Sequence, residues 1–118
     1  MKTMLIADEE VHMRNLLKAI FTQQGYKAQT AINGKEALEK IYDNQFDIAV
    51  ISHDLSVING AQLIDWLDTN EIYTPIVVMG SYIKATEQKV KRYSSVKSVL
   101  YKPFKVQDLT EAVQSIIN

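Results

Sequence analysis

The sequence predicts an α/β domain in which helices cover both faces of a parallel five-stranded sheet. Two observations predict this class: five short apolar runs alternate with five segments of helical period, and most of the runs are apolar throughout. Continuously apolar strands are typical of parallel sheets that are buried on both faces. A length of 118 residues suits one domain of ordinary size, and we expect residues 1–118 to form it.

The first half of the chain predicts three strands and two helices. Residues 4–7 are apolar and run directly into three carboxylates, which indicates a buried strand that ends in an acidic loop. Residues 26–32 are more polar and predict a strand nearer the sheet edge, and residues 48–51 predict a third, buried strand. Apolar stripes of helical spacing lie between these strands, at Met13, Leu16, Leu17, Ile20 and Phe21, and at Ala37, Leu38 and Ile41. Gly25 is suited to end the first helix, and Asn33 to cap the second.

The second half continues the same alternation. A turn at residues 59–60 precedes a helix, and Pro75 precedes a fourth strand at 76–79 that ends at Gly80. Residues 85–93 indicate a helix only weakly, and residues 99–101 predict a short fifth strand. The remaining stripes belong to the third and fifth helices, at Leu63, Ile64 and Leu67, and at Val106, Leu109, Val113 and Ile116.

Composition excludes several classes of site. The chain has no cysteine, so disulfides, thiolate zinc sites and thiol nucleophiles are ruled out, and its two histidines lie far apart in sequence. No apolar run reaches the roughly 18–20 residues of a membrane span, and the N-terminus does not resemble a signal peptide. We therefore expect a cytoplasmic domain without a membrane segment.

Charge is distributed unevenly along the chain. Residues 1–83 hold six Lys or Arg and eleven Asp or Glu, a net −5, whereas residues 84–118 hold seven and three, a net +4. The basic positions are Lys84, Lys89, Lys91, Arg92, Lys97, Lys102 and Lys105. This segment is either a surface for an acidic partner or a solvated helix face. It lacks the arginine-rich, aromatic-interleaved pattern that is typical of nucleic-acid binding. We therefore do not expect this domain to bind nucleic acid.

The ends of the predicted strands carry the polar chemistry. In parallel sheets of this class, ligands bind beyond the carboxyl ends of the strands. Carboxylates follow the first strand, a Ser-His-Asp sequence follows residue 51, and Lys102 follows the fifth strand. Carboxylates that face a lysine are a suitable frame for a divalent cation and a phosphate group.

Taken together, these motifs resemble the receiver domain of bacterial two-component response regulators over the whole chain. The segments that carry the resemblance are residues 4–10, 25–26, 33–38, 47–51, 59–60, 75–79 and 102–104, in order and almost without gaps. The resemblance implies a flavodoxin-like (CheY-like) doubly wound sheet of strand order 2-1-3-4-5 with five helices. It also implies a role in phosphorelay signalling rather than as an enzyme.

Some site residues match the pattern of that family. An acidic pair after the first strand, which holds Mg²⁺ in the family, corresponds to Asp8 and Glu9. The lysine that contacts the phosphoryl group corresponds to Lys102, and the usual cis-proline after it to Pro103.

Three other site positions depart from the pattern. Ser52 stands at the position of the phosphorylatable aspartate, Gly80 at that of the hydroxyl switch residue, and Val99 at that of the aromatic switch. The spacing to residues 59–60 selects Ser52 as the acceptor position. A register shift of two residues would instead select Asp54.

These departures predict a degenerate receiver, or pseudo-receiver. A serine hydroxyl is neutral and needs an adjacent base before it can attack, and the loss of a carboxylate weakens Mg²⁺ binding. We expect Lys102 to neutralise the acidic pair, with Mg²⁺ weak or absent at Asp8 and Glu9 and no other cofactor. The domain would then act by protein–protein interaction, with a histidine kinase, an output domain or a second copy of the chain as partner.

Four residues are candidates for the partner surface: Lys89, Arg92, Tyr101 and Trp66. Receivers usually meet partners on the fourth helix, fifth strand and fifth helix, which is where the basic segment falls. The only tryptophan, Trp66, is either an exposed anchor or a residue that packs over the core edge.

Two other functions remain as alternatives. One is an active receiver that accepts phosphate on Asp54 with Mg²⁺ after the register shift. The other is a flavodoxin-like cofactor enzyme, which is disfavoured because the loop after the first strand is acidic where a phosphate-binding loop would be glycine-rich.

Overall fold

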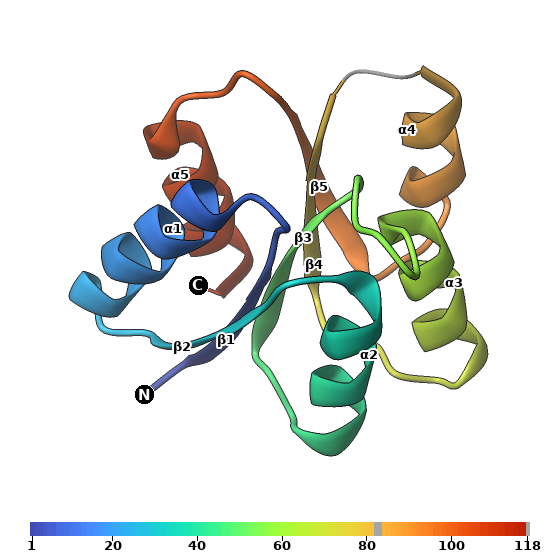
Figure 1. Ribbon diagram of the computed structural model, residues 1–118, viewed down its shortest axis with the longest axis horizontal. Coiled ribbons are helices and arrows are strands. Elements are labelled where there is room, and N and C mark those ends of the chain that lie inside the picture. Colours follow the sequence, from blue (N-terminus) through green and yellow to red (C-terminus); the bar gives the residue numbers. More distant parts are fainter. Residues whose placement is uncertain (82–83, 118) are drawn as a thin grey trace.

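Strands and helices alternate strictly in the computed structural model, which describes residues 1–81 and 84–117 (Figure 1). The strands are β1 (Thr3–Ala7), β2 (Lys27–Ala31), β3 (Ile48–Ser52), β4 (Ile76–Gly80) and β5 (Val96–Tyr101). The helices are α1 (Val11–Gln23), α2 (Gly34–Asp43), α3 (Gly60–Thr69), α4 (Lys84–Lys91) and α5 (Val106–Ile117). The side chain of Lys84, the first residue of the predicted basic segment, lies outside the described part.

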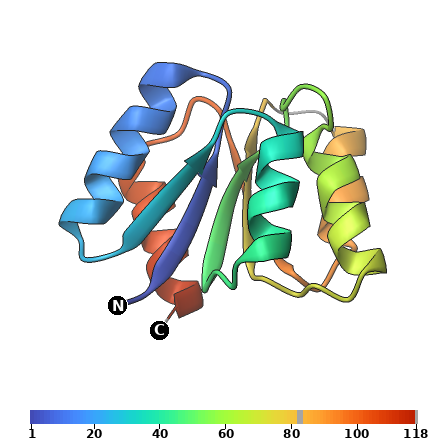
Figure 2. The ribbon, with the colours of Figure 1, turned by 60° about the horizontal axis from the view of Figure 1, so that its bottom comes forward.

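The five strands form one parallel sheet of order β2-β1-β3-β4-β5, which confirms the predicted order. Helices α1 and α5 cover one face, and α2, α3 and α4 cover the other (Figures 1 and 2). Helices α1 to α4 therefore serve as crossovers between successive parallel strands, the arrangement that the alternating pattern predicted, and α5 follows the last strand.

Two apolar cores lie on the two faces of the sheet. Successive residues of the central strands alternate between them, so that Leu5 and Ala7 pack under α2, α3 and α4 while Met4 and Ile6 pack under α1 and α5. Residues of β3 and β4 are buried along the whole length of each strand. Burial on both faces explains why these runs are apolar throughout.

The start of β5 and the end of α4 differ by two or more residues from the sequence-based expectation, and several other strand ends differ by one. Strand β5 begins at Val96 rather than at residue 99, because Val96 pairs with Ile76 before a register irregularity. An edge strand is only half buried, so polar residues at its start hide the pattern. Helix α1 begins at Val11 with Glu10 as its cap, and α4 ends at Lys91 rather than at residue 93.

Side-chain caps start the two helices next to the candidate site. The carboxamide of Asn33 accepts a hydrogen bond from the Glu36 N–H at 2.8 Å, which confirms the predicted cap of α2. Asn59, predicted only as part of a turn, caps α3 through a capping box with Gln62. None of the described helices is long and apolar enough to cross a membrane.

Candidate functional site

The candidate site forms where the carboxyl ends of β1 and β3 meet. Ala7 pairs with Ile51, so Asp8 and Ser52 follow at the same level of the sheet. Both residues are almost completely buried, with exposed fractions of 3% and 2%. Because buried polar groups are rare unless they have partners, this pair marks the strand ends as a polar pocket within the core.

Lys102 reaches Asp8 across the top of the sheet. Its Nζ lies 3.3 Å from Asp8 Oδ2, and the second carboxylate oxygen accepts a hydrogen bond from the Glu10 N–H at 2.9 Å. The Lys102 N–H donates to the Gly80 carbonyl at 2.8 Å, and the peptide bond between Lys102 and Pro103 is cis. The buried Asp8 carboxylate is therefore neutralised by a positioned lysine.

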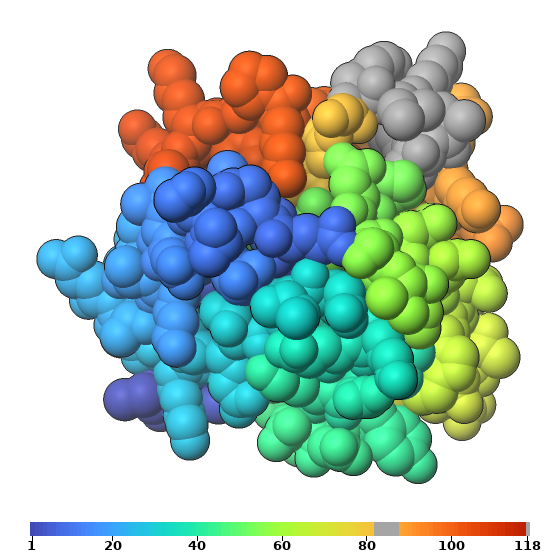
Figure 3. Space-filling model, viewed as in Figure 1, coloured from blue at the N-terminus to red at the C-terminus, as the bar shows by residue number. Residues whose placement is uncertain are grey.

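Glu9 turns away from this ion pair toward the loop that follows β3. Its Oε1 accepts a hydrogen bond from the Ser56 N–H at 2.8 Å. In Figure 3 the blue segment after β1 abuts the green segment after β3. The Ser56 carbonyl in turn accepts from the Gly34 N–H at 3.1 Å, so this loop is held from both sides. The sequence did not predict the contact between Glu9 and Ser56, because 47 residues separate the two.

Glycine at position 34 is required by the close approach of the same loop. A Cβ there would lie 1.7 Å from the Ile58 carbonyl oxygen, which no rearrangement of a side chain could relieve. The start of α2 and the β3–α3 loop thus form one packed unit around the carboxylate of Glu9.

His53 and Asp54 lie outside the pocket. The His53 Nδ1 is 3.3 Å from Asp54 Oδ1, and the Asp54 side chain is 56% exposed. Ser52, by contrast, is the last residue of β3 and pairs with Met79 of β4. The register shift that would bring Asp54 to the strand end therefore receives no support from this geometry.

Gly80 ends β4 directly beside His53. A Cβ at position 80 would lie 3.0 Å from the His53 Cβ, closer than ordinary van der Waals contact. A hydroxyl side chain at this position would therefore crowd the histidine. The sequence offered no signal for this contact, because it depends on which way the His53 side chain leaves the strand end.

The other predicted switch position, Val99, packs with the core beneath α3 and α4. It is half buried and pairs with Val78 of the neighbouring strand. An aliphatic side chain of this size fills its place in the core and has no ring to rotate.

The acidic pair does not form a metal-binding arrangement in this structure. Asp8 is paired with Lys102, and the Glu9 carboxylate is held by the Ser56 N–H. Among the described residues, no group of three His, Cys, Asp or Glu side chains could hold a metal ion. Mg²⁺ is usually bound by one or two carboxylates together with water molecules, and here both carboxylates already have partners within the protein.

The model of one protein family, the response regulator receiver domain, matches residues 4–114 of the chain. The chain belongs to the response regulator receiver family. This receiver is 31% identical over 119 residues to the chemotaxis protein CheY of Thermotoga maritima, covering 98% of this chain and 97% of that protein. It is 27% identical to the response regulator GtcR of Aneurinibacillus migulanus over 97% of this chain.

Solved structures of receivers share the fold. The receiver domain of the Francisella response regulator 1452 superposes with a TM-score of 0.92 at 25% identity, covering 99% of this chain and 97% of that one. The chemotaxis response regulator CheY4 of Vibrio cholerae gives a TM-score of 0.89 at 24% identity, covering 98% of both chains. These likenesses place the chain in the CheY-like fold.

The length covered differs between relatives. This chain spans 47% of GtcR and 24% of the regulatory protein AtoC of Escherichia coli, but nearly all of the Thermotoga CheY. The receiver is thus a signalling module of two-component systems that occurs both in longer regulators and in proteins of its own length.

The four residues predicted for a partner surface come from three neighbouring elements, α3, α4 and β5, and from the segment just after α4. Lys89 is exposed on α4, and Tyr101 is half buried at the end of β5. Trp66 instead packs edge-to-face against Tyr42 of α2, with ring centroids 6.0 Å apart. Trp66 therefore belongs to the surface of α2 and α3, and Tyr42 is a surface residue that the sequence did not single out.

Arg92 is engaged within the receiver. Its guanidinium lies 4.8 Å from the centroid of the Tyr93 ring and donates to the Tyr93 hydroxyl at 2.7 Å. That hydroxyl donates to Asp65 Oδ1 of α3, and this hydrogen bond raises the pKa of Tyr93. The three side chains fasten the end of α4 to α3, which reduces the part of Arg92 that is free to meet a partner.

Proposed function

We propose that this receiver works without phosphorylation and acts by binding protein partners in a two-component pathway. The observation that carries the proposal is the pairing of the buried Asp8 with Lys102 beside a serine at the acceptor position. In the family's mechanism, carboxylates at this place hold Mg²⁺ and accept the phosphoryl group. Here both acidic residues already have partners within the protein.

The pocket lacks a group that could activate Ser52. A serine hydroxyl becomes a nucleophile only when a neighbouring base takes its proton. His53 lies beside Gly80 and Asp54, and the Asp8 carboxylate is paired with Lys102. Transfer from a phosphohistidine to the neutral hydroxyl therefore has no evident catalyst in this pocket.

The relay that follows phosphorylation in the family is also altered. Gly80 has no hydroxyl to contact a phosphoryl group, and Val99 has no ring to move. We therefore propose that the output surface does not depend on the state of the pocket. Its expected partners are a histidine kinase or an output domain, reached through Lys89, Tyr101 and neighbouring residues of α4 and β5.

Phosphorylation can be tested directly by intact mass spectrometry. We expect no adduct on the natural chain after incubation with Mg²⁺ and acetyl phosphate. The matched variant, Ser52→Asp, restores a carboxylate at the same position and should acquire a phosphoryl group. An adduct on the natural chain at Ser52 would overturn the proposal. An adduct that disappears in Asp54→Asn would establish the active receiver instead.

A further inference from the structure

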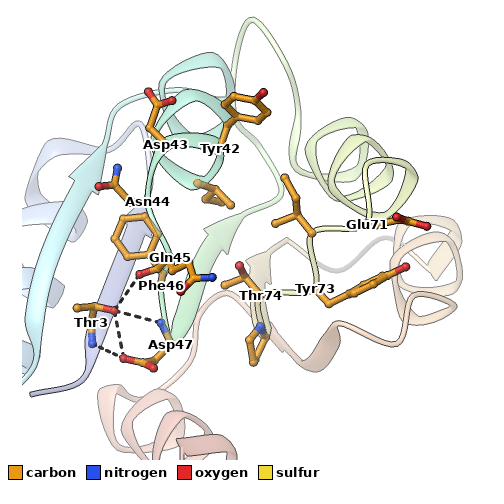
Figure 4. Close-up of a pocket in the computed structure, with 13 residues that line it drawn as sticks. Thr3, Tyr42, Asp43, Asn44, Gln45, Phe46, Asp47, Glu71, Tyr73 and Thr74 are labelled. Carbon is orange, nitrogen blue, oxygen red and sulfur yellow. Dashed lines mark hydrogen bonds between the residues drawn. The ribbon is translucent and has the colours of Figure 1, made fainter.

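A groove opens at the end of the sheet opposite to the pocket of Asp8. It is a cavity of about 640 Å³ between the segment that joins α2 to β3 and the segment that joins α3 to β4. Figure 4 shows Tyr42 and Asp43 at the end of α2 on one side of it, and Glu71 and Tyr73 of the segment between α3 and β4 on the other, with these last two side chains directed away from α2. The floor is fastened by hydrogen bonds between Thr3 and Asp47.

A second cavity continues this groove between α2 and α3. It measures about 210 Å³, shares Tyr42 and Asp43 with the first, and adds Glu39 and Trp66 to the lining. The edge-to-face contact of Tyr42 with Trp66 joins the two cavities. We call the combined surface the amino-end groove, defined by Glu39, Tyr42, Asp43, Trp66, Glu71 and Tyr73.

The amino-end groove combines exposed aromatic rings with negative charge. Tyr42 and Tyr73 are 67% and 59% exposed. Glu39, Asp43 and Glu71 are also exposed, and no Lys or Arg lines either cavity among the described residues. Lys2 acts electrostatically on Asp47, which lines the first cavity.

This combination matches the chemistry of a cationic segment. A guanidinium or ammonium group is attracted to the face of an aromatic ring, and carboxylates beside the ring add charge-assisted hydrogen bonds. We propose that the amino-end groove docks an arginine- or lysine-bearing segment of a protein partner. The groove lies at the opposite end of β3 from Ser52, so docking does not require the phosphoacceptor pocket.

A second copy of the chain is a poorer occupant. Its cations include Arg92, which is already engaged by Tyr93 and Asp65. A contact between the amino-end groove of one copy and the basic segment of another joins two different surfaces. Such a pairing propagates from copy to copy rather than closing into a dimer, unless a rotation happens to close a ring.

Titration with a synthetic arginine–glycine repeat peptide tests the proposal, because Trp66 is the only tryptophan and lies in the groove. We expect a change in Trp66 fluorescence on binding, and calorimetry supplies the affinity. Tyr42→Ala and Glu39→Gln should each weaken binding by about five-fold, whereas Tyr42→Phe should retain it. Both residues are exposed, so unfolding curves should show that the variants fold normally.

Glu111→Gln is the matched control, since it removes the same charge from an exposed position on α5. Absence of binding, or equal weakening by Glu39→Gln and Glu111→Gln, would overturn the proposal in favour of unspecific charge attraction. Self-association of the free chain in sedimentation, abolished by Glu39→Gln, would overturn it in favour of a second copy. Neither measurement involves phosphate, so the result is independent of phosphorylation at Ser52.

Discussion

At the scale of single residues, the ion pair of Asp8 with Lys102 replaces what a metal ion would otherwise do. A carboxylate that is 3% exposed is costly to leave without a counter-charge. Lys102 supplies that charge at 3.3 Å and remains 28% exposed itself. Lys102 therefore supplies the counter-charge that the burial of Asp8 requires.

Removing the lysine should destabilise the fold. Lys102→Met keeps most of the side-chain volume but leaves the Asp8 carboxylate buried without its cation. We expect the free energy of unfolding to fall by about 2 kcal/mol, below the range for fully buried pairs because Lys102 is partly solvated. Urea unfolding measures this, with Lys97→Met on the exposed side of β5 as control. Equal losses in the two variants would contradict the role of the pair.

Backbone strain is stored beside the pocket at Val57. This residue has a φ of 68°, and the Ile58 N–H donates to the Ser56 carbonyl around it, which makes a tight γ-turn. A β-branched residue is unfavourable in this region, whereas glycine adopts it readily. Val57 is also 71% exposed, so its side chain adds little packing.

Relief of this strain should stabilise the protein. We expect Val57→Gly to raise the free energy of unfolding by about 1 kcal/mol. Val11→Gly is the matched control, because Val11 is an exposed valine at the start of a helix and glycine should destabilise it there. Thermal unfolding measures the stability of both variants. A loss of stability in Val57→Gly would contradict the prediction that the turn at Val57 is strained.

At the scale of elements, β4 and the loop after β3 fit together only because position 80 is glycine. Gly80→Ala should cost about 1–2 kcal/mol, since its new methyl carbon would approach the Cβ of His53 to 3.0 Å. In a His53→Gly background the Cβ at position 53 is absent, and Gly80→Ala should then lower the free energy of unfolding much less. A double-mutant cycle with no coupling energy would show that the two residues do not restrict one another.

The Asp47 carboxylate, which titrates with pH, holds the start of β1 to the segment before β3 by a hydrogen bond. The Thr3 N–H donates to Asp47 Oδ2 at 2.7 Å, and this hydrogen bond lowers the pKa of Asp47 below 3.8. Because the folded state then binds the proton less tightly than the unfolded state, the contribution is present above that pH and is lost as the pH falls through the folded pKa.

Acid unfolding of Asp47→Asn tests the contribution of this hydrogen bond to stability. The variant cannot titrate at this position, so its stability should decrease less steeply than that of the natural chain as the pH falls below about 4. Chemical unfolding at a series of pH values gives the two slopes. Identical slopes would mean that the hydrogen bond to Thr3 contributes nothing to the pH dependence.

At the scale of the whole molecule, the two ends of one sheet have separate chemistry. The carboxyl ends of the strands carry the pocket of Asp8, Ser52 and Lys102, while the amino ends carry the amino-end groove. The first lies at the strand ends and in the loops that follow them, and the second on α2, α3 and the segments that lead from these helices to the next strands. The molecule can therefore offer a docking surface even if its phosphoacceptor pocket is silent.

Mg²⁺ should not stabilise the natural chain as a whole. An ion that binds only the folded state raises the unfolding temperature, and the gain grows with the logarithm of its concentration relative to Kd. Here both acidic side chains already have partners within the protein. Millimolar Mg²⁺ should leave the unfolding temperature unchanged, whereas Ser52→Asp should gain several degrees. An equal gain in both proteins would show that Asp8 and Glu9 bind the ion without a third carboxylate.

Much of the architecture was predictable from sequence because hydrophobic periodicity is a local property. The continuous run at 48–51 and the stripe around Leu63 predicted a buried strand and a helix, and both are present. The start of β5 at Val96 was missed, since an edge strand needs less apolar surface and is defined by its pairing with β4. The ordered motifs also identified the family.

The sequence by itself determined the alternation of strands and helices, the receiver family and the serine at position 52. Only the tertiary structure decided that the two acidic side chains separate: Asp8 pairs with Lys102, as expected from the sequence, whereas Glu9 accepts a hydrogen bond from the backbone of Ser56. It also brought Tyr42 to Trp66 and set His53 against Gly80. The physical reason is that periodicity specifies which face of an element is buried, whereas contacts between distant segments depend on strand register and side-chain direction.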